Sequence, residues 1–155
     1  MDFRIKGLSP EPFAPLYGLS DAELAARGVV RYVADSCPGF PDRVELRDAE
    51  PGESLLLLNY EHQPANSPYR SSHAIFVREG ATQAFDRINE IPPVMRPRLL
   101  SLRAFDARGM IVDADLADGK AVEPVIERLL ADTRVEYLHA HYAKFGCFSA
   151  RIERA

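Results

Sequence analysis

The sequence lacks most of the motifs that tie a protein to a particular reaction. It contains two cysteines, Cys37 and Cys147, which lie far apart and have no CxxC spacing. That count excludes a four-cysteine metal site, and the separation indicates reduced thiols rather than a disulfide framework. Glycine-rich phosphate fingerprints, a GxSxG nucleophile elbow and an HExxH helix are also missing. No reaction class is therefore indicated by a motif.

Long apolar runs and an excess of basic residues are lacking as well. With 19 Lys and Arg against 23 Asp and Glu, the formal net charge is -4, and the basic residues are scattered. Nucleic acids and anionic membranes are usually met by a surplus of Lys and Arg. No uncharged span is long enough for a membrane helix, and residues 1–6 do not begin a secretory signal. We therefore expect a cytoplasmic protein without a nucleic-acid or membrane partner.

The overall composition favours a folded globular domain. Hydrophobic residues make up 46% and charged residues 27% of a chain of 155 residues. These are ordinary globular proportions, and a chain of this length can bury a core without disulfides or metals. We therefore expect one domain that spans residues 1–155.

Alternating apolar and polar residues predict strands along most of the chain. Proline and glycine punctuate the segments between them. The best hairpin has residues 106–109 as its turn, where Gly109 suits a positive φ. The predicted strands are residues 3–6, 29–33, 43–47, 55–58, 73–77, 99–105, 110–116, 135–141 and 147–152.

Helix signals are fewer. The clearest helix covers residues 121–131, with an apolar stripe and a proline tolerated in its first turn. A capping box of Ser20 and Glu23 starts a short helix that Gly28 can end, and residues 82–89 suit one or two helical turns. The fold class is therefore α+β: a mixed, mainly antiparallel sheet of about six to eight strands, with one main helix and one or two short helices packed on it.

Several segments, taken together, carry a resemblance to a protein family. These segments are residues 46–53, 67–70, 99–106, 146–148 and 151–154. In order and spacing, over nearly the whole chain, the sequence resembles the bacterial family catalogued as domain of unknown function 1203. That family has no assigned activity. The resemblance therefore implies one intact cytoplasmic domain and supplies no catalytic residue.

The sharpest cluster of chemically active side chains lies in the strand predicted near the end of the chain. His139 and His141 are two residues apart and therefore share one face of a strand. By the same period Asp113 and Asp115 share a face of the predicted hairpin, so carboxylates and imidazoles could form a two-histidine, carboxylate metal site. The alternative is a solvated face on which Arg103 pairs with one of the two aspartates.

Hydroxyl, guanidinium and imidazole groups also gather in a loop that leads into a predicted strand. In this loop Arg70 could hold a carboxylate or phosphate, while Tyr69 and His73 orient the ligand or move a proton. Function concentrates on loops held by a rigid sheet. The alternative is a structural turn in which Arg70 pairs with Glu53 or Glu61.

Cys147 begins the last predicted strand, one strand after His139 and His141. A thiol close to an imidazole is the pairing that thiolate catalysis requires. The alternative is that Cys147 is a small buried hydrophobic residue beside Phe148.

Together these features support two hypotheses. In the first, the chain binds a small molecule or an anion, with or without catalysis, at a site around the 67–73 loop and the 135–147 segment. The candidate catalytic residues are His73, His139 and Cys147, and the candidate ligand-binding residues are Tyr69, Arg70, Arg103 and His141. No cofactor is identified. In the second, the chain is a non-catalytic interaction module that forms a homodimer through a sheet face or an exposed strand edge.

Overall fold

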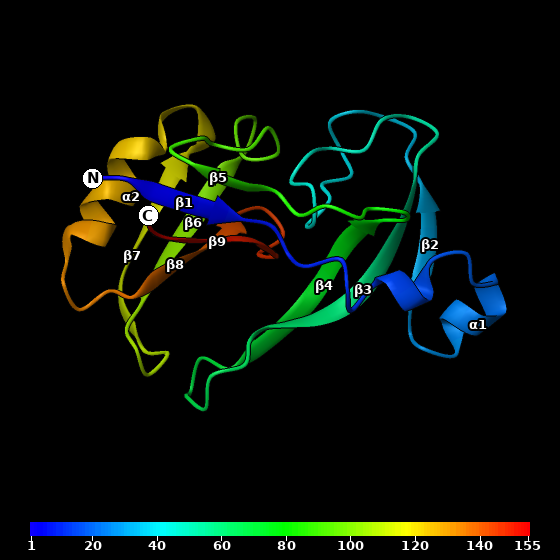
Figure 1. The fold of residues 1–155 in the computed structure, drawn as a ribbon, viewed down its shortest axis with the longest axis horizontal. Helices are drawn as coiled ribbons and strands as arrows, with labels where there is room; N and C mark the ends of the chain where they lie inside the picture. Colours follow the sequence, from blue (N-terminus) through cyan, green and yellow to red (C-terminus); the bar gives the residue numbers. More distant parts are fainter.

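The structure is a computed structural model that describes all 155 residues, and its larger part is a six-stranded antiparallel sheet (Figure 1). The strand order is β5-β1-β9-β8-β6-β7. The strands are β1 (Phe3–Lys6), β5 (Asp86–Ile88), β6 (Leu99–Phe105), β7 (Ile111–Asp118), β8 (Tyr137–Tyr142) and β9 (Phe148–Arg154). The predicted hairpin is confirmed, since β6 and β7 pair along their length and Gly109 in the turn has a φ of 75°.

A second sheet of three strands stands beside the first, in the order β2-β3-β4 (Figure 1). Its strands are β2 (Val30–Val33), β3 (Ser54–Gln63) and β4 (Ser71–Arg78). The predicted run of leucines lies in β3, which is the central strand and is therefore flanked by strands on both sides. A bulge after Tyr60 shifts the register before β3 ends at Gln63. The end of β3 lies close to the larger sheet, since Nε2 of Gln63 donates to the hydroxyl of Tyr137 in β8 at 3.0 Å.

The helices are short. Helix α1 (Asp21–Ala25) begins at the predicted capping box, in which Ser20 and Glu23 bond each other's backbone amides. Helix α2 (Glu123–Ala131) lies within the predicted helical segment and covers one face of the six-stranded sheet (Figure 1). Two 3-10 turns, η1 (Ala14–Leu16) and η2 (Gly119–Ala121), complete the set. Neither α-helix has the length and apolar composition needed to cross a bilayer.

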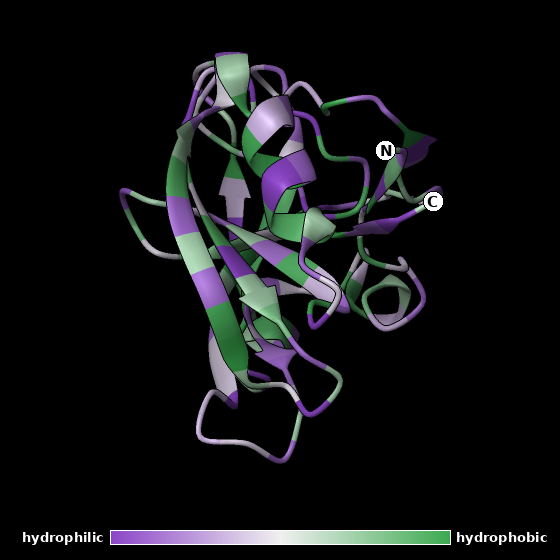
Figure 2. Cartoon of the chain, turned by 90° about the vertical axis from the view of Figure 1, so that its left-hand side faces the viewer, coloured by the Kyte–Doolittle hydropathy of each residue, from purple (hydrophilic) through white to green (hydrophobic).

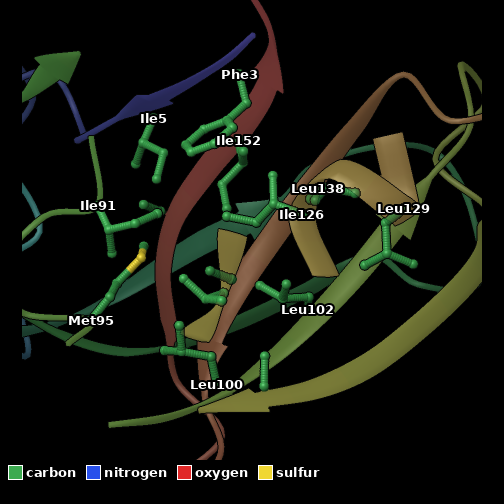
Figure 3. Close-up of a cluster of buried hydrophobic side chains, with 14 of the residues drawn as sticks. Phe3, Ile5, Ile91, Met95, Leu100, Leu102, Ile126, Leu129, Leu138 and Ile152 are labelled. Atoms are coloured by element: carbon green, nitrogen blue, oxygen red, sulfur yellow. The ribbon is translucent and has the colours of Figure 1, made fainter. Parts of the chain in front are cut away.

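The main hydrophobic core lies between α2 and the six-stranded sheet (Figure 3). Leu102 of β6 and Leu138 of β8 point into it together with Ile126 and Leu129 of α2. Along the strands, hydrophobic and hydrophilic residues alternate (Figure 2), so residues next to the core leucines face the other way. The face of β6 and β8 opposite α2 is therefore the one that meets the smaller sheet. The fold class is α+β, as predicted.

The strands divide between two sheets, and one predicted strand does not form. Residues 43–47 are irregular, and Leu46 has a positive φ of 54°. Val44 and Leu46 are both buried, but Val44 packs in the core of the smaller sheet and Leu46 in the main core. The alternation of apolar and polar residues at 43–47 therefore arises because Val44 and Leu46 are buried in two different cores, and not because one face of a strand is buried. The carboxylate of Asp42, which accepts the amides of Glu45 and Arg78, holds this turn in place.

Residues 82–89, predicted to form helical turns, contain strand β5 instead. β5 pairs antiparallel with β1, and Arg4 forms an ion pair with Asp86 across the two strands. Asn89 also accepts the Phe3 amide on its side-chain oxygen. The prediction was wrong because pairing with the free edge of β1 outweighs a weak local preference for helix.

Candidate functional site

A pocket of about 790 Å³ opens between the smaller sheet and the hairpin that joins β8 to β9. The lining residues come from four parts of the chain: Gly39, Pro41 and Arg43; Leu57 of β3 and residues 73–76 of β4; residues 97–99; and residues 142–145 with Cys147. Nine of its 16 lining residues are hydrophobic, and none is Asp or Glu. Small-molecule sites typically measure about 300–1,000 Å³ and are mostly apolar with a few polar groups. The pocket has the size and lining of such a site.

Arg43 is the buried cation of this pocket, with 1% of its surface exposed. Its Nε donates to the carbonyl oxygen of Phe148 at 2.8 Å, and its Nη1 donates to that of Pro41. Its Nη2 donates to Sγ of Cys147 at 3.1 Å. Two of these acceptors are backbone carbonyls and the third is a sulfur, and no carboxylate pairs with this guanidinium. A buried charge without a counter-charge is costly, so Arg43 is an unusual residue to place here.

A second arginine approaches the pocket with its charge already balanced. The guanidinium of Arg98 donates to both carboxylate oxygens of Asp48, at 2.7 and 2.9 Å. The guanidinium carbons of Arg43 and Arg98 lie 5.0 and 5.1 Å from the centre of the Tyr142 ring, which both cations therefore contact. Burial raises the pKa of Tyr142, so its phenol stays protonated.

Cys147 lies in the pocket wall and is buried. Its sulfur contacts Arg43 and not an imidazole. The reason is the alternation along β8. Cys147 belongs to the main core together with Tyr142 and Ala140, whereas His139 and His141 point to the opposite face. The cysteine–histidine pairing expected from the sequence is therefore wrong.

Three buried histidines meet where the two sheets face each other. His62 of β3 lies with its ring centre 4.9 Å from that of His141 and 6.3 Å from that of His139, both of β8. The Phe148 ring stacks on His62 at 5.5 Å. We call these three residues the histidine cluster. It joins the smaller sheet to the larger one.

The histidine cluster is uncharged at neutral pH. Burial, together with neighbouring positive groups, lowers the pKa of both His139 and His141 to about 3 and also lowers that of His62. Nδ1 of His141 donates to the carbonyl oxygen of Gly146 at 2.9 Å. Nδ1 of His62 and Nδ1 of His139 have no hydrogen-bond partner. The histidine cluster therefore consists of neutral imidazoles that contact aromatic rings and form few hydrogen bonds.

Arg103 lies beside this cluster. It is directly opposite His139 in the pairing of β6 with β8, so the two side chains share a face. Its only side-chain hydrogen bond is a long one, 3.4 Å, to Oγ of Ser101, and burial lowers the pKa of its guanidinium. The alternative in which Arg103 pairs with Asp113 or Asp115 is wrong.

The three candidate residues in and after the loop before β4, Tyr69, Arg70 and His73, do not come together at one site. Arg70 is exposed and forms an ion pair with Glu61 at 3.1 Å, which is the structural alternative raised above. The Tyr69 ring packs against Phe105, with ring centres 6.3 Å apart. Only His73, which is half-buried and lies in β4 itself, reaches the pocket. Tyr69 and Arg70 therefore lie outside the pocket.

The aspartates of β7 do not meet the histidines. Asp113 and Asp115 pair with Arg128 of α2, at 3.4 and 2.5 Å. In the register of β6 with β7 they lie opposite Ala104 and Leu102, which face the helix, while Arg103 and the histidines face away. The expected two-histidine, carboxylate arrangement is wrong because a one-residue difference in phase places these groups on opposite faces. No group of three or more His, Cys, Asp or Glu side chains is arranged to hold a metal ion.

Comparison with known proteins identifies the family. The family model described as "Protein of unknown function (DUF1203)" matches residues 39–154. The chain belongs to this family. The matched region contains every residue that lines the pocket and all three members of the histidine cluster. No curated protein and no solved structure matches the chain.

Within the region that defines the family, sequence reasoning missed Arg43, Arg98, Tyr142 and His62. Arg43 looked like an outward-facing residue of a strand, and its burial depends on a turn that no local pattern marks. His62 lies beyond the strand predicted at residues 55–58, because β3 continues to Gln63. The available signal was the continued alternation of Tyr60 and His62 after the leucines of β3.

Proposed function

We propose that this domain binds a small organic anion in the pocket between the two sheets. The observation that carries the proposal is Arg43, a buried guanidinium without a carboxylate partner in a pocket without acidic residues. Lys144 also lines the pocket and, together with Arg43, makes its potential positive. A bound anion would supply the counter-charge that Arg43 lacks.

The proposal concerns binding of a ligand. If the domain also catalyses a reaction on that ligand, two side chains of the pocket have suitable chemistry. Cys147 and His73 line the pocket, and a thiol and an imidazole are groups that attack or transfer protons. Both cysteines are free, which fits the reducing cytoplasm that we propose as the compartment of this protein.

A thermal-shift screen tests the proposal. The protein is heated with acetate, benzoate, citrate or phosphate, each at constant ionic strength. A ligand present at about 100 times its dissociation constant stabilises a protein by about 2.7 kcal/mol, which for a domain of this size raises Tm by roughly 5–10 °C. We expect at least one organic anion to give such a shift. Equal Tm values for all the anions and for a chloride control would contradict the proposal.

A second candidate function, self-association, is favoured by strand β2. This strand is an edge of the three-stranded sheet, and its Val30, Tyr32 and Val33 side chains are exposed, Val33 by 60%. An exposed edge strand offers unpaired amides and carbonyls to a second strand. We propose that two copies of the chain pair along β2, as the second hypothesis from the sequence expects.

A lysine in β2 should prevent this association. For the wild-type protein we expect the sedimentation-equilibrium mass to rise with concentration, and for Val33→Lys we expect a monomer throughout, because a lysine on an edge strand opposes pairing with a second strand. Leu116→Lys is the matched control, since Leu116 is equally exposed, at 59%, on the edge strand of the other sheet. A wild-type mass that stays monomeric at all concentrations would rule out this function.

A further inference from the structure

The charges of the pocket limit the charge of its ligand. Of its cations, Arg98 is neutralised by Asp48, and Lys144 lies at the exposed tip of the β8–β9 hairpin, where water screens it. Arg43 alone is both buried and unbalanced. One buried positive charge is matched by one negative charge, and a second negative charge on the ligand would have to be buried without a partner. The count of charges therefore favours a monoanion.

The free donors of Arg43 favour a carboxylate. A guanidinium carries five N–H groups, and Arg43 uses one on each of its three nitrogens for Phe148, Pro41 and Cys147. One N–H on Nη1 and one on Nη2 remain without an acceptor. A carboxylate commonly accepts two N–H groups from one guanidinium. The pocket also lacks the glycine-rich backbone cradle with which proteins usually bind phosphate groups.

The rest of the lining favours an apolar body attached to that carboxylate. Leu57 and Phe76, which pair across β3 and β4 and share one face of the smaller sheet, line the pocket together with Pro97, Leu99 and Phe145. Phe145 is 77% exposed, more than any other large apolar side chain of the protein. An apolar ligand would cover this ring and remove its surface from water. Phe145 therefore marks the end of the pocket where the apolar part of a ligand would lie.

Resting on the proposed function, we infer that the ligand is a monocarboxylic acid with an apolar body. Its carboxylate binds Arg43, and its apolar part lies between Phe76 and Phe145. The other lining groups agree with this orientation, since the cation at the pocket mouth, Lys144, is next to Phe145 and can remain solvated while the ligand is bound.

Calorimetric titration with 4-phenylbutyrate, its neutral amide and inorganic phosphate tests the inference. We expect the carboxylate to bind at least about tenfold more tightly than the amide, because the amide cannot balance the charge of Arg43. We expect phosphate to bind more weakly than 4-phenylbutyrate, because it would bury a second charge and no apolar surface. Equal binding of acid and amide would overturn the inference.

A variant of Phe145 separates the apolar contribution from the charge. Because Phe145 is exposed, Phe145→Ala should fold normally, and we expect it to bind 4-phenylbutyrate about three- to tenfold more weakly while its affinity for acetate is unchanged. Leu116→Ala, at an exposed leucine outside the pocket, is the matched control. Unchanged affinity of Phe145→Ala for 4-phenylbutyrate would overturn the placement of the apolar body.

The outcomes distinguish this inference from the function on which it rests. Binding of phosphate or citrate without binding of 4-phenylbutyrate would overturn the ligand class but support an anion-binding pocket. Absence of binding for every anion would overturn both.

Discussion

Replacing Arg43 with methionine is expected to weaken the binding of organic anions by about 10- to 100-fold, whereas Arg70→Met leaves it unchanged. Arg43 carries the unbalanced buried charge of the pocket. Arg70, the arginine that the sequence favoured, is exposed and already paired with Glu61. A hydrogen bond to a charged group contributes about 1.5–3 kcal/mol, so the net loss of one such bond corresponds to the range stated. Calorimetry on both variants measures it.

The folding of the Arg43 variants needs its own control. The Arg43 side chain also donates to the carbonyl oxygens of Pro41 and Phe148, so methionine leaves these two groups without a donor. Arg43→Lys retains the charge but not the forked donors, and we expect it to bind anions with intermediate affinity. Circular dichroism and Tm establish that each variant is folded. Loss of binding in Arg70→Met together with full binding in Arg43→Lys would contradict the account.

Acidification is expected to destabilise the protein at a pH above that at which its ion-paired glutamates titrate. His139 and His141 have a pKa of about 3 in the folded state, against an ordinary value of 6.5. Below about pH 6.5 the unfolded chain therefore binds protons that the folded chain does not, and stability falls as pH falls. Between about pH 7.5 and pH 5.5 the two residues together should lower the free energy of unfolding by about 2–3 kcal/mol. The lowered pKa of His62 acts in the same direction.

Urea denaturation at a series of pH values measures this dependence. Ion pairs with arginines hold the pKa values of Glu53 and Glu79 near 2. Their contribution to the free energy of unfolding is lost only below their ordinary pKa of 4.5, so it does not overlap with the pH range in which the histidines lower stability. We expect His139→Phe to reduce the slope by up to about 1.4 kcal/mol per pH unit, since phenylalanine fills the aromatic cluster without titrating. His73→Gln, which alters the half-buried histidine outside the cluster, is the control. A wild-type stability that is flat from neutral pH to about pH 5 would refute the burial argument.

Much of the fold follows from sequence period alone. The alternation in β6, β7, β8 and β9 predicts these strands, and the capping box of Ser20 and Glu23 predicts the start of α1. Such patterns are local and reflect burial of one face. Residues 43–47 show where prediction from sequence period fails, because the apolar side chains of this alternating segment are buried in two different cores. The division of the strands into two sheets is likewise set by long-range packing that no short window contains.

The candidate site could be predicted only in part. The shared face of His139 and His141 follows from strand period, and the register of β6 with β8 places Arg103 on the same face. The phase of β7 relative to β8 depends on the register across two strand pairs, so the sequence could not exclude Asp113 and Asp115 from that face. Arg43 becomes noticeable only when its burial and its lack of a carboxylate are known together.

The most direct test of the central claim is a crystal structure of the protein with 4-(4-bromophenyl)butyrate, in which the anomalous signal of bromine locates the ligand. The account predicts a bromine peak between Phe76 and Phe145, with a carboxylate oxygen within about 3.5 Å of the Arg43 guanidinium. A pocket that stays empty at a saturating ligand concentration, or a ligand seated only elsewhere on the protein, would contradict it.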